Sequence, residues 1–596
     1  MSHERKIYPF RVVMLRVIPL LLKTVPLHCV VSILLGMIGA LLMTVGVIAT
    51  QRLFDTIASA AAGNAGFWDT VIPLLLLAGV TFGQEIAQGV MNFQSRSVMS
   101  GKAVGKILSL LHLKLQRIDS SRFEDTSFLD DLNKAREGSW AIPYFGIVMF
   151  LLASMYLVFF ASIGAYLFSL KPLLLITLVL SFLPALFSQI IRAKVYTKLE
   201  EQSAPLRREN EYYQRTLCDR EYFKETRILG AFNFLHGLYT VTMQLFTQKQ
   251  WQAERNMSFL QLALDISTFV GMAVSSYLLF TATMAGYITV GTFAAVFAAL
   301  GTLFRMMQEV VTMHIGSMNR DIGRIANFIR MLDMPERTGT RGTPDFAKGV
   351  IAENVSFTYP GKDTPATREV SLTIADGETI AIVGENGAGK STLARLLTGI
   401  YRPLEGRVSI GGLDTSVTAT ESLFKCTSGV FQKFQRYKMN LGDNVAISDA
   451  WAKDVDSAAL EIQSALNEAG VDLEYPLDTM LSPEFGGVDL SGGQWQRLAI
   501  ARGLYRINNF IVLDEPTAAI DPIEELRVYT QFQRLAENKC AIIITHRLSS
   551  AKLARRIIVM DNGKIADIGT HDELLSRRGK YADMWEAQAQ WYSDSV

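Results

Sequence analysis

The sequence predicts a multi-domain membrane protein in which an all-α six-helix transmembrane domain is followed by an α/β P-loop ATPase domain. Long apolar runs fill the first half of the 596 residues, whereas short β-rich runs alternate with helical segments in the second half. That alternation predicts a sheet with a large parallel part. Turn residues cluster where the apolar runs stop. We therefore expect a transmembrane domain at 1–332, a linker at 333–349 and a nucleotide-binding domain at 350–596.

Six apolar stretches of about 20 residues or more are long enough to cross a bilayer core of roughly 30 Å as helices. The first is too long and too far from the start of the chain to be a secretory signal, so it should remain as an anchor. The expected spans are 27–49, 71–93, 145–168, 172–192, 259–282 and 288–308.

Lysine and arginine are unevenly distributed between the two sides of these spans. They gather before the first span and after the second, while the segments 50–70 and 283–287 have almost none. Cytoplasmic segments carry such an excess of positive charge. Both termini are therefore expected in the cytoplasm.

Long polar segments separate spans two and three and spans four and five, and both are rich in helix-forming residues. We expect each to be a helical stalk that turns back on itself, at about 121–132 and 219–230. Each turn presents aromatic residues in a charged frame, as in Tyr222 and Phe223. Such a turn is either a short helix that docks on a partner or a solvated loop with a chance aromatic pair.

Ionisable residues inside the expected spans need an explanation, because each costs roughly 2.5–3.5 kcal/mol at the middle of a spanning helix. Glu85 lies with Gln84 and Gln88 near the middle of the second span. Either this face is turned to a wet cavity or it pairs with a neighbouring helix. Asp265 and Glu309 lie nearer the inner ends of their spans, where water reaches them.

The segment from Gly384 to Ser391 reads Gly-x4-Gly-Lys-Ser, the pattern of a phosphate-binding loop. An apolar strand precedes it and a helix follows it. Backbone N–H groups in such a loop face phosphate oxygens at the helix N-terminus, and the lysine neutralises the β and γ phosphates. The expected ATP-binding residues here are Gly384, Glu385, Asn386, Gly387, Ala388, Gly389, Lys390, Ser391 and Thr392, and the Ser391 hydroxyl is expected to bind Mg²⁺.

A second apolar run, Phe510 to Leu513, reads as a buried strand that delivers Asp514 and Glu515 at its carboxyl end. Beside the phosphate-binding loop, Asp514 should hold Mg²⁺ and Glu515 should act on the attacking water. On its own this pattern is weak evidence for a nucleotide site, but together with the phosphate-binding loop it is strong evidence.

Composition excludes other classes of function. The net charge of +1 argues against a nucleic-acid-binding protein, for which a strongly basic face is expected. The four cysteines are scattered without metal-ligand or paired spacing. They read as reduced thiols in a cytoplasm-facing protein.

The stretch from Leu490 to Gln494, Leu-Ser-Gly-Gly-Gln, resembles the signature of the ATP-binding cassette transporters in its order and spacing relative to the other motifs, and the resemblance covers the whole chain. It implies that the signature binds the γ-phosphate held by the opposite subunit. It also assigns a magnesium and coupling role to Gln432, adenine stacking to Tyr359, γ-phosphate contact to His546 and an interface loop to Asp521. The implied signature residues are Ser491, Gly492, Gly493 and Gln494.

The resemblance further implies ATP and Mg²⁺ as cofactors and a dimer as the working unit, because one chain has one cassette. Every catalytic position carries the active-type residue, so a homodimer is favoured over an unseen partner. The long stalks resemble those of exporters in this family. The resemblance also implies a location in a bacterial inner membrane. The stretches from Phe431 to Tyr437 and from Glu484 to Gln496 resemble exporters of lantibiotic peptides more narrowly, although Lys433 replaces an acid.

Three functions stay open from the sequence. The first is an ATP-driven exporter of a peptide or amphiphile. The second is a flippase for a lipid or lipid-linked glycan, or a multidrug exporter, on the same scaffold. The third is a non-transporting channel or sensor. ATP-coupled uptake into vesicles would separate the third from the other two.

Overall fold

The computed structural model describes residues 8–449, 458–472, 474–506, 508–515, 532–533 and 536–593, apart from some side chains between 182 and 204, at 312 and 319, and from 591 onward. The chain forms two compact units. The first, a helical unit, comprises Met1–Leu113 and Asp131–Asp333. The second, the cassette unit, comprises Lys114–Asp130 and Met334–Val596. The second unit therefore includes a short piece of the first stalk.

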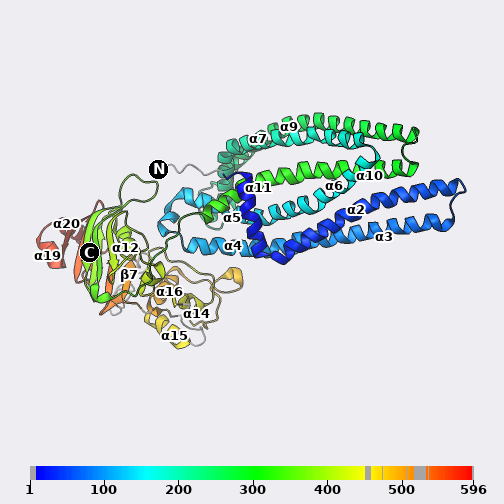
Figure 1. Cartoon of the computed structure of the whole chain (residues 1–596). Coiled ribbons are helices and arrows are strands. Elements are labelled where there is room, and N and C mark those ends of the chain that lie inside the picture. The colour runs from blue at the N-terminus through cyan, green and yellow to red at the C-terminus, as the bar shows by residue number, and fades with distance from the viewer. Residues whose placement is uncertain are drawn as a thin grey trace. The chain divides into compact units, whose positions relative to one another are not determined.

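The helical unit is built from long helices that lie side by side (Figure 1). Three short π-helical segments, η1, η3 and η4, interrupt them, which the sequence did not reveal. The elements are α1 (Phe10–Thr24), α2 (Pro26–Ala61), α3 (Phe67–Asn92), η1 (Phe93–Met99), α4 (Ser100–Gln116), α5 (Thr126–Leu151), η3 (Leu152–Tyr156), α6 (Leu157–Leu170), α7 (Pro172–Cys218), α8 (Phe223–Ile228), α9 (Phe232–Met284), α10 (Val290–Gln308), η4 (Glu309–Ile315) and α11 (Gly316–Leu332).

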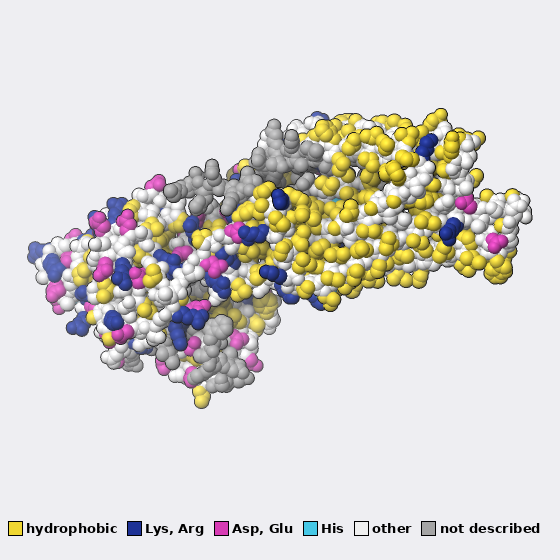
Figure 2. Space-filling view, viewed as in Figure 1, with side chains coloured by type: hydrophobic (Ala, Val, Ile, Leu, Met, Phe, Trp, Pro, Cys, Tyr) yellow, Lys and Arg dark blue, Asp and Glu magenta, His cyan; other side chains and the backbone are white. Residues whose placement is uncertain are grey.

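Five helical stretches in the described part of the chain are long and apolar enough to cross a membrane. They are Pro26–Ala61, Phe67–Gln116, Thr126–Leu170, Phe232–Met284 and Val290–Leu332. The fourth expected span, 172–192, lies in α7, where the apolar stretch Pro172–Ser188 is shorter, so this crossing stays a prediction. Hydrophobic side chains cover most of the visible face of the helical unit, as a lipid-facing surface requires (Figure 2).

Small residues let the helices of this unit approach closely. Ser32, Gly36, Ala40 and Thr44 recur every fourth residue on α2 and are buried. A methyl group on Gly36 would lie 2.2 Å from the Ser154 hydroxyl oxygen, so only glycine fits there. Without water to drive association, such close backbone contact is what holds helices together inside a membrane.

The structure confirms both expected turns of the stalks. The second is the short helix α8 between α7 and α9, and it leaves apolar side chains exposed, including Ile228 and Leu229. The first is η2 (Ser120–Glu124), a 3₁₀ turn capped by the Asp119 carboxylate, which accepts a hydrogen bond from the Ser121 N–H at 3.0 Å.

The cassette unit contains two sheets. A four-stranded antiparallel sheet, in the order β2-β1-β4-β5, comprises β1 (Val350–Phe357), β2 (Thr367–Ile374), β4 (Glu405–Ile410) and β5 (Leu413–Asp414). A six-stranded sheet, in the order β10-β9-β3-β8-β7-β6, comprises β3 (Thr379–Gly384), β6 (Thr427–Val430), β7 (Phe510–Asp514), β8 (Cys540–Ile544), β9 (Arg556–Asp561) and β10 (Lys564–Gly569). All pairs in the second sheet except β9–β10 are parallel, which confirms the expected parallel part.

Helices surround these sheets. The longer ones are α12 (Lys390–Leu397), α15 (Ala459–Glu468), α16 (Gly492–Tyr505) and α20 (Lys580–Ser593). The shorter ones are η5 (Phe346–Lys348), α13 (Thr420–Phe424), α14 (Leu441–Ala446), η6 (Ile447–Asp449), η7 (Pro483–Phe485), α18 (Leu548–Ala551) and α19 (His571–Ser576).

Strands β3, β7 and β8 are almost wholly buried, which explains their near-continuous runs of branched apolar residues. Their parallel order brings their carboxyl ends to one edge of the sheet. The residues that follow β3, β6, β7 and β8 therefore meet there, as ligand-binding residues do in open α/β sheets.

Candidate functional site

The phosphate-binding loop joins the carboxyl end of β3 to the N-terminus of α12. Gly384, Gly387 and Gly389 adopt φ angles of 149°, 82° and 95°, which other residues rarely reach. A side chain at Gly389 would also lie 2.3 Å from the Ala366 carbonyl oxygen. The Lys390 ammonium donates hydrogen bonds to the carbonyl oxygens of Gly384 and Glu385, both at 2.9 Å, and so lies folded along the loop.

Asp514 lies beside this loop at the end of β7. The Ser391 hydroxyl donates a hydrogen bond to its carboxylate at 3.2 Å. Burial and the neighbouring Glu515 carboxylate raise the pKa of Asp514. A cation held here would relieve this repulsion, and a hydroxyl beside a carboxylate is the oxygen-donor set that Mg²⁺ prefers. The two residues thus fit the expected magnesium site.

Glu515 has a φ angle of 46°, a strained value for a residue other than glycine. Its carboxylate accepts a hydrogen bond from the Gln432 amide at 2.7 Å and contacts the His546 ring nitrogen Nε2. Burial raises the pKa of Glu515 and Lys390 opposes the rise, while burial and Lys390 lower the pKa of His546. A neutral His546 that donates its Nε2 proton to Glu515 fits these directions.

These residues line one cavity of about 490 Å³. It brings together ten of the residues expected from the sequence, which come from five separate stretches of chain. They are Tyr359, Asn386, Gly387, Gly389, Lys390, Ser391, Thr392, Gln432, Glu515 and His546. Ala366 also lines it, and Asp514 is bonded to its wall through Ser391.

The signature segment is not among the residues that line this cavity in the described part of the chain. Ser491 instead caps α16, and its hydroxyl accepts from the Gln494 N–H at 3.3 Å. The Gln494 amide oxygen in turn accepts from the Ser491 N–H at 2.8 Å. Ser491 and Gly492 are exposed. Asp521 lies outside the described residues.

Among the polar residues around Tyr359, Thr392 is expected from the sequence, but Arg395 and Tyr401 are not. The Tyr359 hydroxyl lies 2.9 Å from the Thr392 hydroxyl and accepts a hydrogen bond from the Arg395 guanidinium at 3.2 Å. Arg395 also donates to the Tyr401 hydroxyl at 3.1 Å. The one signal in the sequence for this cluster was Arg395 itself, because it is a charged residue in the last turn of a helix that is largely buried.

The first stalk turn reaches this cluster within the cassette unit. The Tyr401 hydroxyl donates to the Glu124 carboxylate at 2.5 Å, and Arg395 lies 3.6 Å from the same oxygen. Asp119 lies 3.9 Å from Arg402. Burial and the bond to Glu124 raise the pKa of Tyr401, so its hydroxyl stays a donor. A continuous polar chain therefore runs from Glu124 to Thr392 on the phosphate-binding helix.

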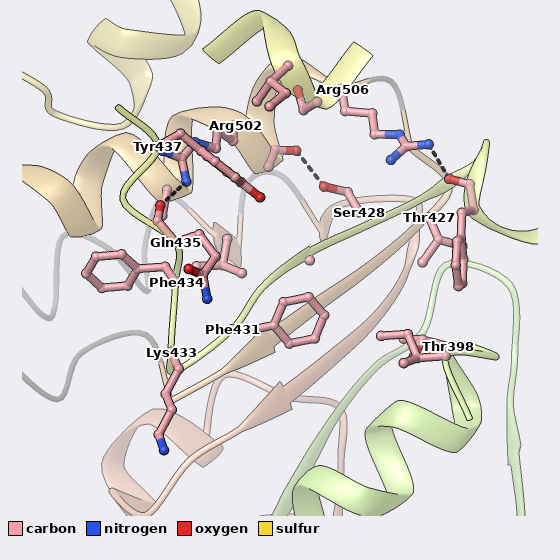
Figure 3. A pocket seen from close by; sticks show the side chains of 18 residues that line it. Thr398, Thr427, Ser428, Phe431, Lys433, Phe434, Gln435, Tyr437, Arg502 and Arg506 are labelled. Carbon is pink, nitrogen blue, oxygen red and sulfur yellow. Dashed lines mark hydrogen bonds between the residues drawn. The ribbon is translucent and has the colours of Figure 1, made fainter. Parts of the chain in front are cut away.

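A second cavity of about 390 Å³ opens beside β6, and Figure 3 shows its lining. Phe431 and Phe434 supply apolar surface to it, and the Arg502 guanidinium lies 4.9 Å from the centre of the Tyr437 ring. Arg502 also donates to the Gln435 carbonyl oxygen at 2.7 Å. Because Gln432 lines the first cavity while Phe431 and Lys433 line the second, one short segment borders both.

Comparison with known proteins finds a family model, described as ABC transporter, that matches residues 367–518. The chain is 28% identical over 526 residues to the Subtilin transport ATP-binding protein SpaT of Bacillus subtilis, covering 86% of this chain and 84% of that protein. It is 27% identical over 516 residues to the Nisin transport ATP-binding protein NisT of Lactococcus lactis subsp. lactis, covering 83% and 84%.

A third relative, an ATP-dependent lipid A-core flippase of Haemophilus ducreyi, is 35% identical over 316 residues, which is 52% of this chain and 53% of that protein. The match to this flippase thus spans about half of each chain. Among solved structures, a bacterial Atm1-family ABC exporter with ATP bound superposes with a TM-score of 0.80 at 23% identity. That alignment covers 95% of this chain and 98% of the exporter chain, so the two share a fold.

Proposed function

Because this chain belongs to the ATP-binding cassette transporters, as an exporter half-transporter with an ATPase coupled to transport, we propose that it moves a peptide or amphiphilic substrate out of the cytoplasm as a homodimer. One observation carries the peptide assignment. Two relatives that match both halves of the chain are named for the transport of subtilin and nisin.

The geometry of the first cavity supports an ATPase role for each group in it. Lys390 and the loop N–H groups would hold the phosphates, with Tyr359 against the adenine. Glu515 would act as the general base. Gln432 and His546 would orient its carboxylate, because each of them contacts a different carboxylate oxygen. Ser391, Asp514 and Gln432 would hold Mg²⁺, which when bound neutralises phosphate charge.

The absence of the signature from the described lining of this cavity supports the homodimer. Ser491, Gly492, Gly493 and Gln494 would complete it only from a second copy, with Asp521 in the loop at the interface. One copy supplies both halves, so two identical chains would make two equivalent sites.

The chain is an integral membrane protein. The lysine and arginine bias supports cytoplasmic termini, and the bacterial relatives support a bacterial inner membrane.

Export of a lipid or a lipid-linked glycan is the second candidate, favoured by the 35% identity to the lipid A-core flippase. That match spans only half of either chain, whereas the matches to the subtilin and nisin proteins reach over 80% of each. The peptide candidate is therefore placed first. A multidrug exporter on the same scaffold comes after the flippase, and a channel or sensor that transports nothing is the last candidate.

The test uses the full chain reconstituted in nanodiscs and in inside-out vesicles. A panel of amphipathic peptides, lipids and drugs is screened for stimulation of ATP hydrolysis, and the best stimulant is then followed for ATP-dependent uptake. We expect a peptide both to stimulate hydrolysis and to accumulate. Accumulation of a lipid but of no peptide would support the flippase instead, and hydrolysis without any uptake would support a sensor.

A further inference from the structure

A cavity of about 360 Å³ lies inside the helical unit, between α2, α3, η3 and the junction of α10 with η4. Three charged side chains line it: Glu85 from α3, Arg305 from α10 and Glu309 from η4. Gln84 and Gln88 add amide groups. The segments that form it belong to four of the expected spans, with Glu85 near the middle of the second span and Arg305 near the inner end of the sixth.

Nothing in the described structure neutralises Glu85. Neither its carboxylate nor the Arg305 guanidinium has a hydrogen bond or ion pair with another described residue. Glu309 has a long contact, with its carboxylate 3.9 Å from the His314 ring nitrogen, and it also interacts with the buried Tyr156 hydroxyl. Unpaired carboxylates are costly in a spanning helix, and when present they usually mark a substrate or ion pathway. The expectation that Glu85 pairs with a neighbouring helix is therefore not supported.

The rest of the lining suits an amphiphile. Met43, Met91, Met155 and Met306 surround the charged groups with flexible thioether side chains, which adapt to apolar surfaces of varied shape. Two of the bordering segments, η3 and η4, are π-helical, and π-helical turns occur frequently at functional sites. Two carboxylates against one guanidinium leave the cavity with an excess negative charge.

We propose that this cavity binds a protonated amine carried by an amphiphilic substrate, with the Glu85 and Glu309 carboxylates as its acceptors and the methionines around the adjoining apolar part. The inference rests on the proposed export function and narrows its substrate to the cationic class. Binding of the amine would offset the charge that the empty cavity leaves uncompensated.

The experiment compares two fluorescent probes on the full chain in nanodiscs without nucleotide. One is an amphipathic peptide that contains lysine, and the other is the same peptide with every amine acetylated. The wild-type protein should bind the amine form at least about 10-fold more tightly, as a hydrogen-bonded charge pair would give. Glu85→Gln and Glu309→Gln should each lower this preference toward one.

Asp265→Asn is the matched control, because Asp265 is a carboxylate in a neighbouring span that accepts a hydrogen bond from Gln261 of its own helix at 2.8 Å and does not line the cavity. It should keep the full preference. Nucleotide binding shows that each variant is folded, and Gln88→Lys should abolish the preference, because its positive charge cancels the excess negative charge of the lining. An unchanged preference in both glutamate variants would overturn the proposed site.

Uptake by vesicles separates this inference from the proposed function. A wild-type protein that prefers the amine peptide but accumulates no peptide keeps the amine site and overturns peptide export. A wild-type protein that accumulates both peptides equally, with no preference in binding, keeps export and overturns the amine site. Failure to bind either peptide would overturn both.

Discussion

Glu515 is the residue on which hydrolysis should depend most. We expect Glu515→Gln to lower ATP hydrolysis by about 10²–10⁴-fold, because an amide keeps the shape and still accepts from Gln432 but cannot take a proton. ATP affinity should persist, since Lys390 and the loop are untouched. Phosphate release and nucleotide binding measure the two effects.

Glu353→Gln is the control for this substitution, because Glu353 is an exposed glutamate on β1, which belongs to the other sheet and not to the one that contains β7. It should hydrolyse ATP at the wild-type rate. Hydrolysis by Glu515→Gln within a few fold of wild type would mean that another group takes the proton.

The polar chain around Tyr359 shows where residue-level prediction from sequence stops. The loop glycines, Lys390 and the Asp514–Glu515 pair have local signatures, because strand, turn and helix are neighbours in the chain. Contact between Tyr401 and Glu124 joins residues 277 positions apart and leaves no local pattern. Only folding brings them together.

Among the elements, the first stalk turn is the one that folds as part of the cassette unit. Glu124→Gln should raise the KM for ATP by a few fold with a smaller effect on kcat, because the half-exposed carboxylate holds Tyr401 and Arg395, which in turn position Tyr359. Steady-state ATPase kinetics separate the two constants.

Glu137→Gln provides the comparison, since Glu137 forms an exposed ion pair with Arg324 at 3.7 Å in the helical unit. Exposed pairs of this kind contribute little, so its KM should not move. A wild-type KM for ATP in Glu124→Gln would show that Tyr359 is positioned without the stalk turn.

The second stalk turn, α8, presents half-exposed aromatic side chains at Tyr222 and Phe223. We expect them to dock in an apolar groove of a cassette. Replacing both with alanine should remove about 2–4 kcal/mol of contact if they are buried there. Transport and substrate stimulation should fall together, while basal ATPase survives.

Replacement of the adjacent aromatic residues Tyr212 and Tyr213 in α7 tests whether the effect is specific to the turn. That control pair should transport normally in proteoliposomes. Normal transport by the Tyr222/Phe223 double variant would mean that α8 is a solvated loop.

Several elements escaped sequence analysis for physical reasons. The π-helical segments differ from α-helix by one extra residue in a turn, which no composition marks. Helix α1 precedes the first expected span and is too short to register as membrane-spanning. The four-stranded antiparallel sheet was not separated from the parallel one, because short strands with alternating burial read alike until they are paired.

For the whole molecule, the decisive proposal is that each ATP site is shared between two copies. We expect the ATPase activity of a mixed dimer to depend on whether two inactivating substitutions lie on the same chain or on different chains. With Ser491→Arg on one chain and Lys390→Ala on the other, both lesions fall in one composite site and the second site keeps every group. With both on one chain beside a wild-type chain, each site carries one lesion.

ATPase assays on the two purified mixed dimers make the comparison, with wild-type dimer as the reference. The first arrangement should retain activity from its intact site, and the second should retain little. Equal rates would argue against a shared site, provided that a dimer with one intact site turns over, which a Lys390→Ala/wild-type dimer establishes independently.

The reciprocal cap at the start of α16 has a thermodynamic consequence for the proposed dimer. The N–H groups of Ser491 and Gln494 already have acceptors within one copy, so a phosphate from the second copy would compete with these acceptors. Exchange of one hydrogen bond for another yields only the difference between the two. Closure of the proposed dimer would therefore be only weakly favourable and easily reversed once the terminal phosphate leaves.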